Sequence, residues 1–185
     1  MARNTLIRTM HDVGLAAWFG GSLMGAVGLN AAAGVVDDEK QRGRVANEGW
    51  DRWTPLNAAA IGAHLLGGAG LLLTNRDRLA QQKGVAAMTA VKTALTGAAL
   101  GATAYSRVLG RQLSQERDVP ASSGTEPADQ TPDHLAKAQS QLRTLQWLIP
   151  ATTAAVLIAN AYAGEQQRPS EVGKGMAKRV RQLAS

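Results

Sequence analysis

Three ionisable side chains interrupt or border the apolar part of this 185-residue chain, and they are its first candidates for chemistry. His64 lies near the middle of residues 53–75, a run of 23 residues without Asp, Glu, Lys or Arg. Lys92 is the one charge within residues 84–106, and Asp12 stands immediately before a third apolar run. Ionisable groups inside a membrane are costly and usually functional, so each of the three needs a role.

His64 has several possible roles. A neutral imidazole bonded to a threonine or a carbonyl would be structural, whereas a haem or metal ligand and a site of proton or quinone chemistry are functional alternatives. A bis-histidine haem needs a second histidine at similar depth, but helix rise places His11 roughly 15 Å away along the membrane normal. His134 is expected outside the membrane. We therefore keep His64 as a candidate cofactor-binding residue and predict no bound cofactor and no metal.

Lys92 lies about 12 Å into its run at 1.5 Å per residue. Its side chain can extend toward the end of the bundle where Asp12 is expected. The sequence therefore predicts a buried ion pair between Asp12 and Lys92, with His11 close by. A stripe of hydroxyl groups near the lysine is formed by Thr89, Thr93, Thr96 and Thr103. The pair either fastens two helices or belongs to a proton path or a polar headgroup site.

The elements that must position these residues follow from the charge pattern. Four stretches of 21 to 24 residues, at 13–36, 53–75, 84–106 and 144–164, share a single charge. About 20 uncharged residues are enough for a helix to cross a bilayer core of roughly 30 Å. The sequence predicts an all-α four-helix transmembrane bundle over residues 1–166, with spans at about 11–36, 54–75, 84–107 and 144–164.

The segments outside the spans are polar. Residues 108–143 are predicted to form an exposed, partly disordered loop. At its start, residues 107–117 are predicted to continue the third helix. Residues 118–131 are predicted to be irregular, and a helix is predicted to begin at Thr131-Pro132-Asp133. Residues 167–185 are predicted to form a basic amphipathic tail helix on anionic lipid, and the net charge of +6 is assigned to lipid, not to nucleic acid. The lipid-binding residues would be Lys174, Lys178, Arg179 and Arg181.

Orientation is predicted from the positive residues. Ten Lys and Arg lie in the N-terminus, the second connection and the tail, against nine in the first and third connections. The ten lie in short segments near the helix ends, where such charges weigh most. We therefore place the protein in the inner (plasma) membrane with both termini in the cytoplasm, and treat the first span as uncleaved because Asp12 interrupts a signal-peptide pattern.

Small residues offer faces for helix packing. Close approach through such faces drives helix association in lipid. The candidate packing residues are Gly21, Gly25, Gly97, Gly101, Ala151, Ala155 and Ala159. They are predicted to line the bundle interior. The alternative is that one of these small-residue faces is left free for a partner protein. Leu148, Val156 and Leu157 are predicted to face lipid.

The segment 11–21, HDVGLAAWFGG, resembles the first helix of copper-resistance D-type membrane proteins, in which a histidine precedes an aromatic residue and paired glycines. The likeness covers about a dozen residues, and no second histidine motif follows, so a copper role is not implied. The whole chain is similar to uncharacterised four-helix integral membrane proteins of actinobacteria, which implies a fold and no activity.

No nucleophile elbow, phosphate-binding loop, dinucleotide-binding pattern or paired metal motif is present, and the chain has no cysteine. We therefore expect no enzyme. The preferred prediction is an accessory or scaffolding subunit, with anionic lipids and other integral membrane subunits of an envelope or respiratory complex as partners. The alternatives are an electron- or proton-handling protein centred on His64 and Lys92, and a component of a small-molecule transporter.

Overall fold

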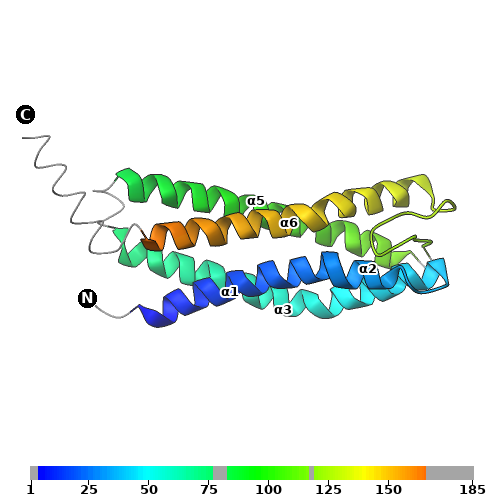
Figure 1. The fold of residues 1–185 in the computed structure, drawn as a ribbon, viewed down its shortest axis with the longest axis horizontal. Helices are drawn as coiled ribbons and strands as arrows, with labels where there is room; N and C mark the ends of the chain where they lie inside the picture. The colour runs from blue at the N-terminus through cyan, green and yellow to red at the C-terminus, as the bar shows by residue number, and fades with distance from the viewer. Residues whose placement is uncertain (1–3, 77–82, 117–118, 166–185) are drawn as a thin grey trace, which may run out of the picture.

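The computed structural model describes residues 4–76, 83–116 and 119–165, and over these residues it is an all-helical bundle (Figure 1). The first helix is continuous and consists of α1 (Thr5–Met24), a π-helical turn η1 (Gly25–Leu29) and α2 (Asn30–Ala33). The others are α3 (Glu39–Thr74), α5 (Lys83–Gln115) and α6 (Asp133–Glu165).

All four helices are long and apolar enough to cross a membrane, which confirms the prediction of a multi-pass helical bundle. With 33 to 36 residues in α3, α5 and α6, each measures about 50 Å at 1.5 Å per residue. That exceeds a hydrocarbon core of roughly 30 Å, so the polar ends project beyond it. Both ends of the described chain, near Asn4 and Glu165, lie at one end of the bundle, and residues 119–132 lie at the other (Figure 1). The four basic tail residues Lys174, Lys178, Arg179 and Arg181 lie outside the described residues.

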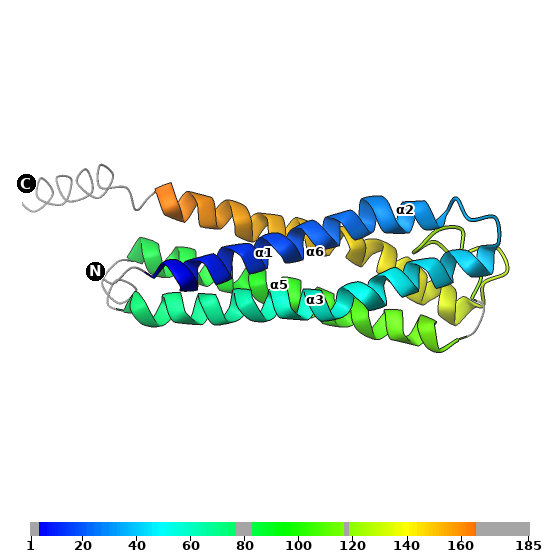
Figure 2. The ribbon, with the colours of Figure 1, turned by 90° about the horizontal axis from the view of Figure 1, so that it is seen from below.

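The bundle consists of two helical hairpins. The first helix packs along α3, and α5 packs along α6. The hairpins meet mainly where α1 lies against α6, whereas α3 and α5 make few contacts with each other (Figure 2). A seam therefore runs along the bundle between α3 and α5.

Glycines fix how closely α1 and α3 approach each other. A Cβ atom at Gly14 would meet the backbone of Ala60 and His64, and one at Gly67 would lie 2.5 Å from the backbone nitrogen of His11. Further along the hairpin, the rings of Trp53 and Trp50 fill the space beside Gly21 and Gly25. These two glycines are packed in the bundle, as the sequence analysis expected.

The small-residue faces of α5 and α6 lie elsewhere than predicted. Gly97 and Gly101 are exposed, and a Cβ atom at either would meet nothing within 4 Å. Ala151 is exposed, and Ala155 and Ala159 are half-buried. The buried face of α6 instead carries larger side chains, namely Leu145, Ile149, Thr153 and Val156, which fill the interior toward α1 and α5. Val156, expected in lipid, is 1% exposed.

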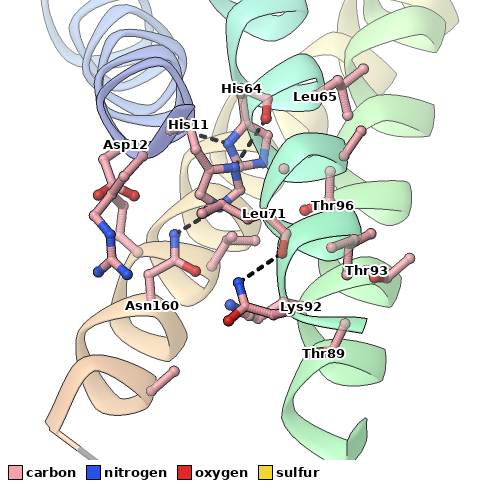
Figure 3. A pocket seen from close by; sticks show the side chains of 18 of the residues that line it. His11, Asp12, His64, Leu65, Leu71, Thr89, Lys92, Thr93, Thr96 and Asn160 are labelled. Atoms are coloured by element: carbon pink, nitrogen blue, oxygen red, sulfur yellow. Dashed lines mark hydrogen bonds between the residues drawn. The ribbon is translucent and has the colours of Figure 1, made fainter. Parts of the chain in front are cut away.

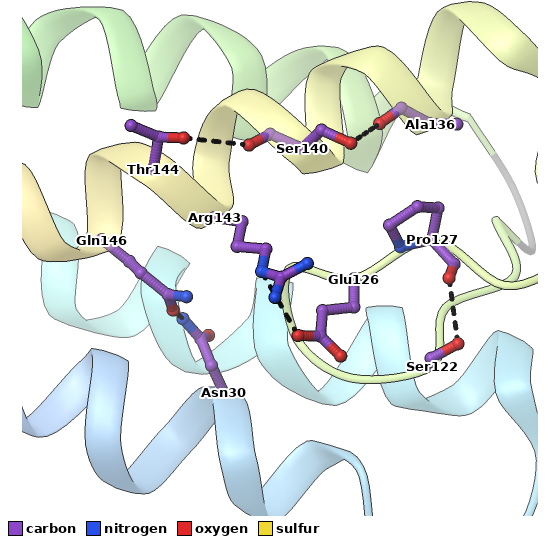
Figure 4. Close-up of polar contacts among 9 residues, drawn as sticks. All are labelled: Asn30, Ser122, Glu126, Pro127, Ala136, Ser140, Arg143, Thr144 and Gln146. Atoms are coloured by element: carbon purple, nitrogen blue, oxygen red, sulfur yellow. Dashed lines mark hydrogen bonds and ion pairs between the residues drawn. The ribbon is translucent and has the colours of Figure 1, made fainter.

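Residues 119–132 are irregular, as predicted, but they are packed where partial disorder was expected. The amide of Ala121 donates to the carbonyl of Glu39, and that of Gly124 donates to the carbonyl of Asn30. Figure 4 shows two further links, between Glu126 and Arg143 and between Asn30 and Gln146. Backbone bonding to two helices explains the order, which a Pro- and Ser-rich composition does not reveal.

Candidate functional site

A cavity of about 660 Å³ lies inside the bundle at the end where the termini lie. All four helices contribute to its walls, which reach from Arg8, Asn75 and Gly164 near the helix ends inward to His64 and Leu100. Its polar side chains are those of Arg8, His11, Asp12, His64, Asn75, Thr89, Lys92, Thr93, Thr96 and Asn160. The cavity therefore brings together His64, Lys92 and Asp12, the three ionisable residues that the sequence puts forward for chemistry.

Two histidines stack on each other in this cavity (Figure 3). The ring centroids of His11 and His64 are 4.1 Å apart, and the ring planes meet at 18°. His64 is 2% exposed and His11 is half-buried. The prediction that His11 lies far from the level of His64 is therefore wrong.

The close α1–α3 contact explains the pairing. The backbone of His64 lies against Gly14, and the backbone of His11 lies against Gly67. Each histidine stands three residues before a glycine of its own helix, and that glycine lets the backbone of the other histidine approach. The distance of each histidine from the end of its own charge-free run does not give their relative depth, because the two runs are offset along the paired helices.

Reciprocal hydrogen bonds fix both rings. Nδ1 of His11 lies 3.0 Å from the carbonyl oxygen of His64, and Nδ1 of His64 lies 2.9 Å from the carbonyl oxygen of His11. A carbonyl can only accept, so each Nδ1 carries the hydrogen and each neutral ring keeps a lone pair on Nε2. Nε2 is therefore the position at which either ring can take up a proton.

Asn160 of α6 completes the pair and was not identified from the sequence. Its Nδ2 lies 3.4 Å from Nε2 of His11, while its Oδ1 is buried and has no partner among the described residues. The signal that could have identified it is a polar amide within a charge-free run. Nε2 of His64 makes no hydrogen bond to another described residue.

Asp12 and Lys92 line the same cavity but do not form the predicted ion pair in the described structure. Asp12 is on α1 and Lys92 is on α5, and α1 packs mainly on α3 and α6, so the two side chains come from helices that are not closely packed together (Figure 3). The cavity lies between the two charges. Thr89, Thr93 and Thr96 line it beside the lysine, whereas Thr103 accepts a hydrogen bond from Trp18 at 3.2 Å instead.

The geometry does not fit a haem between the two histidines. Rings stacked at 4.1 Å leave no room for a macrocycle plane, and both Nδ1 atoms are bonded to carbonyls. The described residues also contain no group of three His, Cys, Asp or Glu side chains that could hold a metal ion. What the site can do with its own groups is accept, hold and release a proton.

Comparisons with protein-family models, with curated proteins and with solved structures found no match to this chain.

Proposed function

We propose that this integral membrane protein takes up and releases protons at the His11–His64 pair. The observation that carries the proposal is the reciprocal bonding of the two rings, which leaves a proton-accepting Nε2 atom on each inside a cavity. The same cavity holds Asp12 and Lys92, which can exchange protons or balance the charge of the pair. This function corresponds to the electron- or proton-handling alternative from the sequence, and the pairing of His11 with His64 favours it over the accessory and transporter hypotheses.

The stack limits the charge that the pair can hold. Two imidazolium rings at 4.1 Å would repel each other by about 4 kcal/mol at an effective dielectric constant of 20. The pair should therefore take up one proton and resist the second. Arg8 and Lys92 add to this repulsion, and Asp12 opposes it.

Nitrogen-15 magnetic resonance of labelled histidine in liposomes tests the proposal. The chain has three histidines, and His134 is exposed outside the cavity, so His134→Gln leaves only the signals of the pair. As the pH is lowered, one ring equivalent should gain a proton on Nε2 while the other keeps its Nδ1–H form. Two rings that stay neutral throughout, or two rings that protonate together, would contradict the proposal.

We further propose that the protein lies in the plasma membrane with both termini in the cytoplasm and with its basic tail on anionic lipid. The Lys and Arg residues at the end of the bundle that carries both termini lie in short segments close to the helix ends, and this placement supports the orientation. The cavity with the histidine pair then faces the cytoplasm.

An accessory role in a larger membrane complex is the second candidate. It is favoured by the exposed Gly101 on α5, which lines neither cavity and beside which a helix of another subunit could approach closely. Gly101→Leu should remove the protein from a high-mass complex on native gels, because the larger side chain separates the helices. Gly20→Leu is the matched control, since Gly20 is also exposed with nothing within 4 Å of its Cβ position. A complex that survives Gly101→Leu would exclude this face.

A further inference from the structure

A second cavity, of about 320 Å³, lies toward the other end of the bundle. All four helices contribute to its lining, and it reaches Gly124 and Thr125 in the loop at that end. Asp51 and Arg107, which form an ion pair at 2.6 Å, line it. Its mouth is thus built from the polar helix ends that project beyond a bilayer core.

Buried polar atoms in this cavity lack partners. Trp53 Nε1, Asn57 Oδ1 and Arg107 Nε make no hydrogen bond among the described residues, and all three residues line the cavity. Leaving such atoms dry costs free energy, and a cavity of about 320 Å³ has room for water molecules that can satisfy them. We therefore treat the second cavity as a hydrated vestibule.

A thin layer of packed side chains separates the two cavities. Leu100 lines both of them, so they approach each other from opposite ends of the bundle. Trp18 lines neither and is fully buried. Its ring lies 6.3 Å from that of His64 in the first cavity, and its Nε1–H donates to Thr103, which lines the second.

We propose that the two cavities are the halves of a proton path across the membrane and that Trp18 is the gate between them. The proposal rests on the proposed proton uptake at the histidine pair. In the closed arrangement the indole blocks the path, because its N–H is a donor with no lone pair and cannot relay a proton. When the ring turns aside, water can join Nε2 of His64 to Thr103, and the proton leaves Nε2 for that water and then for the vestibule.

The charged groups that face the histidine pair are few. Arg8 and Asp12 come from α1 and Lys92 comes from α5, whereas α3 and α6 contribute no charged side chain to the lining of the first cavity. The two cationic groups on the cytoplasmic side of the gate disfavour proton entry, and Asp12 offsets part of this effect.

Proton flux into liposomes, driven by a potassium diffusion potential and read with an enclosed pH-sensitive dye, tests the gate. Trp18→Ala should raise the flux by about tenfold or more over the wild type, since a modest fall in a barrier changes a rate tenfold. Trp147→Ala is the matched control, because Trp147 is 52% exposed and should leave the flux unchanged. Adding His64→Gln to Trp18→Ala should return the flux to the wild-type level.

Two results would overturn the gate. One is an unchanged flux in Trp18→Ala, and the other is a raised flux that persists without His64, which would show a leak elsewhere. Trp18→Phe, which keeps most of the ring but loses the bond to Thr103, should raise the flux to an intermediate level and serves if the alanine variant does not fold. If the nitrogen-15 spectra show the expected protonation of the pair but Trp18→Ala does not raise the flux, the proposed proton uptake stands and the gate proposal fails.

Discussion

Gly67→Ala is the change that should separate the two histidines most directly. Its Cβ atom would lie 2.5 Å from the backbone nitrogen of His11 and 2.6 Å from the carbonyl oxygen of Ile7. Ordinary contacts begin at 3.4 Å, so α1 must move away by about 0.9 Å. Backbone atoms cannot rotate aside as a side chain can, so the strain reaches the whole α1–α3 contact.

The magnitude follows from two opposing effects. Overpacking of this kind costs about 1–3 kcal/mol. Replacing glycine by alanine inside a helix gains up to about 1 kcal/mol from propensity. Gly62→Ala on the same helix is the matched control, because its Cβ atom meets nothing within 4 Å and gives the propensity gain alone. The difference between the two variants should therefore be about 1–3 kcal/mol.

Equilibrium unfolding in mild detergent, followed by tryptophan fluorescence, measures that difference, and nitrogen-15 spectra of the same samples report the Nδ1 bonds. We expect Gly67→Ala to be the less stable variant and to weaken both Nδ1 bonds to carbonyls. Unfolding free energies that agree within about 0.5 kcal/mol would refute the reasoning that Gly67 sets the helix separation.

Three further predictions concern the rest of the bundle. Cysteine at Ser123 should react with an impermeant maleimide from outside intact cells and cysteine at Ser185 should not, and the reverse pattern would invert the proposed orientation. Asn30→Leu should lower the unfolding free energy by about 1–3 kcal/mol, because Trp50 Nε1–H then loses its buried acceptor at 2.9 Å, which thermal unfolding can measure. The backbone N–H of Lys40 lowers the pKa of Asp38 below 3.8, so its stabilising effect is present above that pH and is lost as pH falls through the lowered value. Asp38→Asn should remove this acid-dependent loss from a pH series of unfolding measurements.

The fold was accessible from the sequence because its signal is strong and local. A charge-free run of more than 20 residues has few stable solutions other than a membrane helix, so four runs predicted four helices. The loop at residues 119–132 was harder, since its order depends on contacts with Glu39 and Asn30, about 80 to 100 residues away in the chain. The buried face of α6 was misjudged for a related reason. A ladder of small residues indicates where helices can approach closely, but larger side chains can equally form the packed face, as the buried Val156 does.

The histidine pair depends on helix register, and the sequence contains a signal for it that charge counting overlooks. In an antiparallel hairpin, facing residues have numbers with a nearly constant sum. Gly21 faces Trp53 and Gly25 faces Trp50, so small residues meet large ones with sums of 74 and 75. Continuing that register places His11 opposite residue 63 or 64, which is where His64 stands. Complementary volumes, more than distance from the end of an apolar run, therefore decide which ionisable groups meet inside such a bundle.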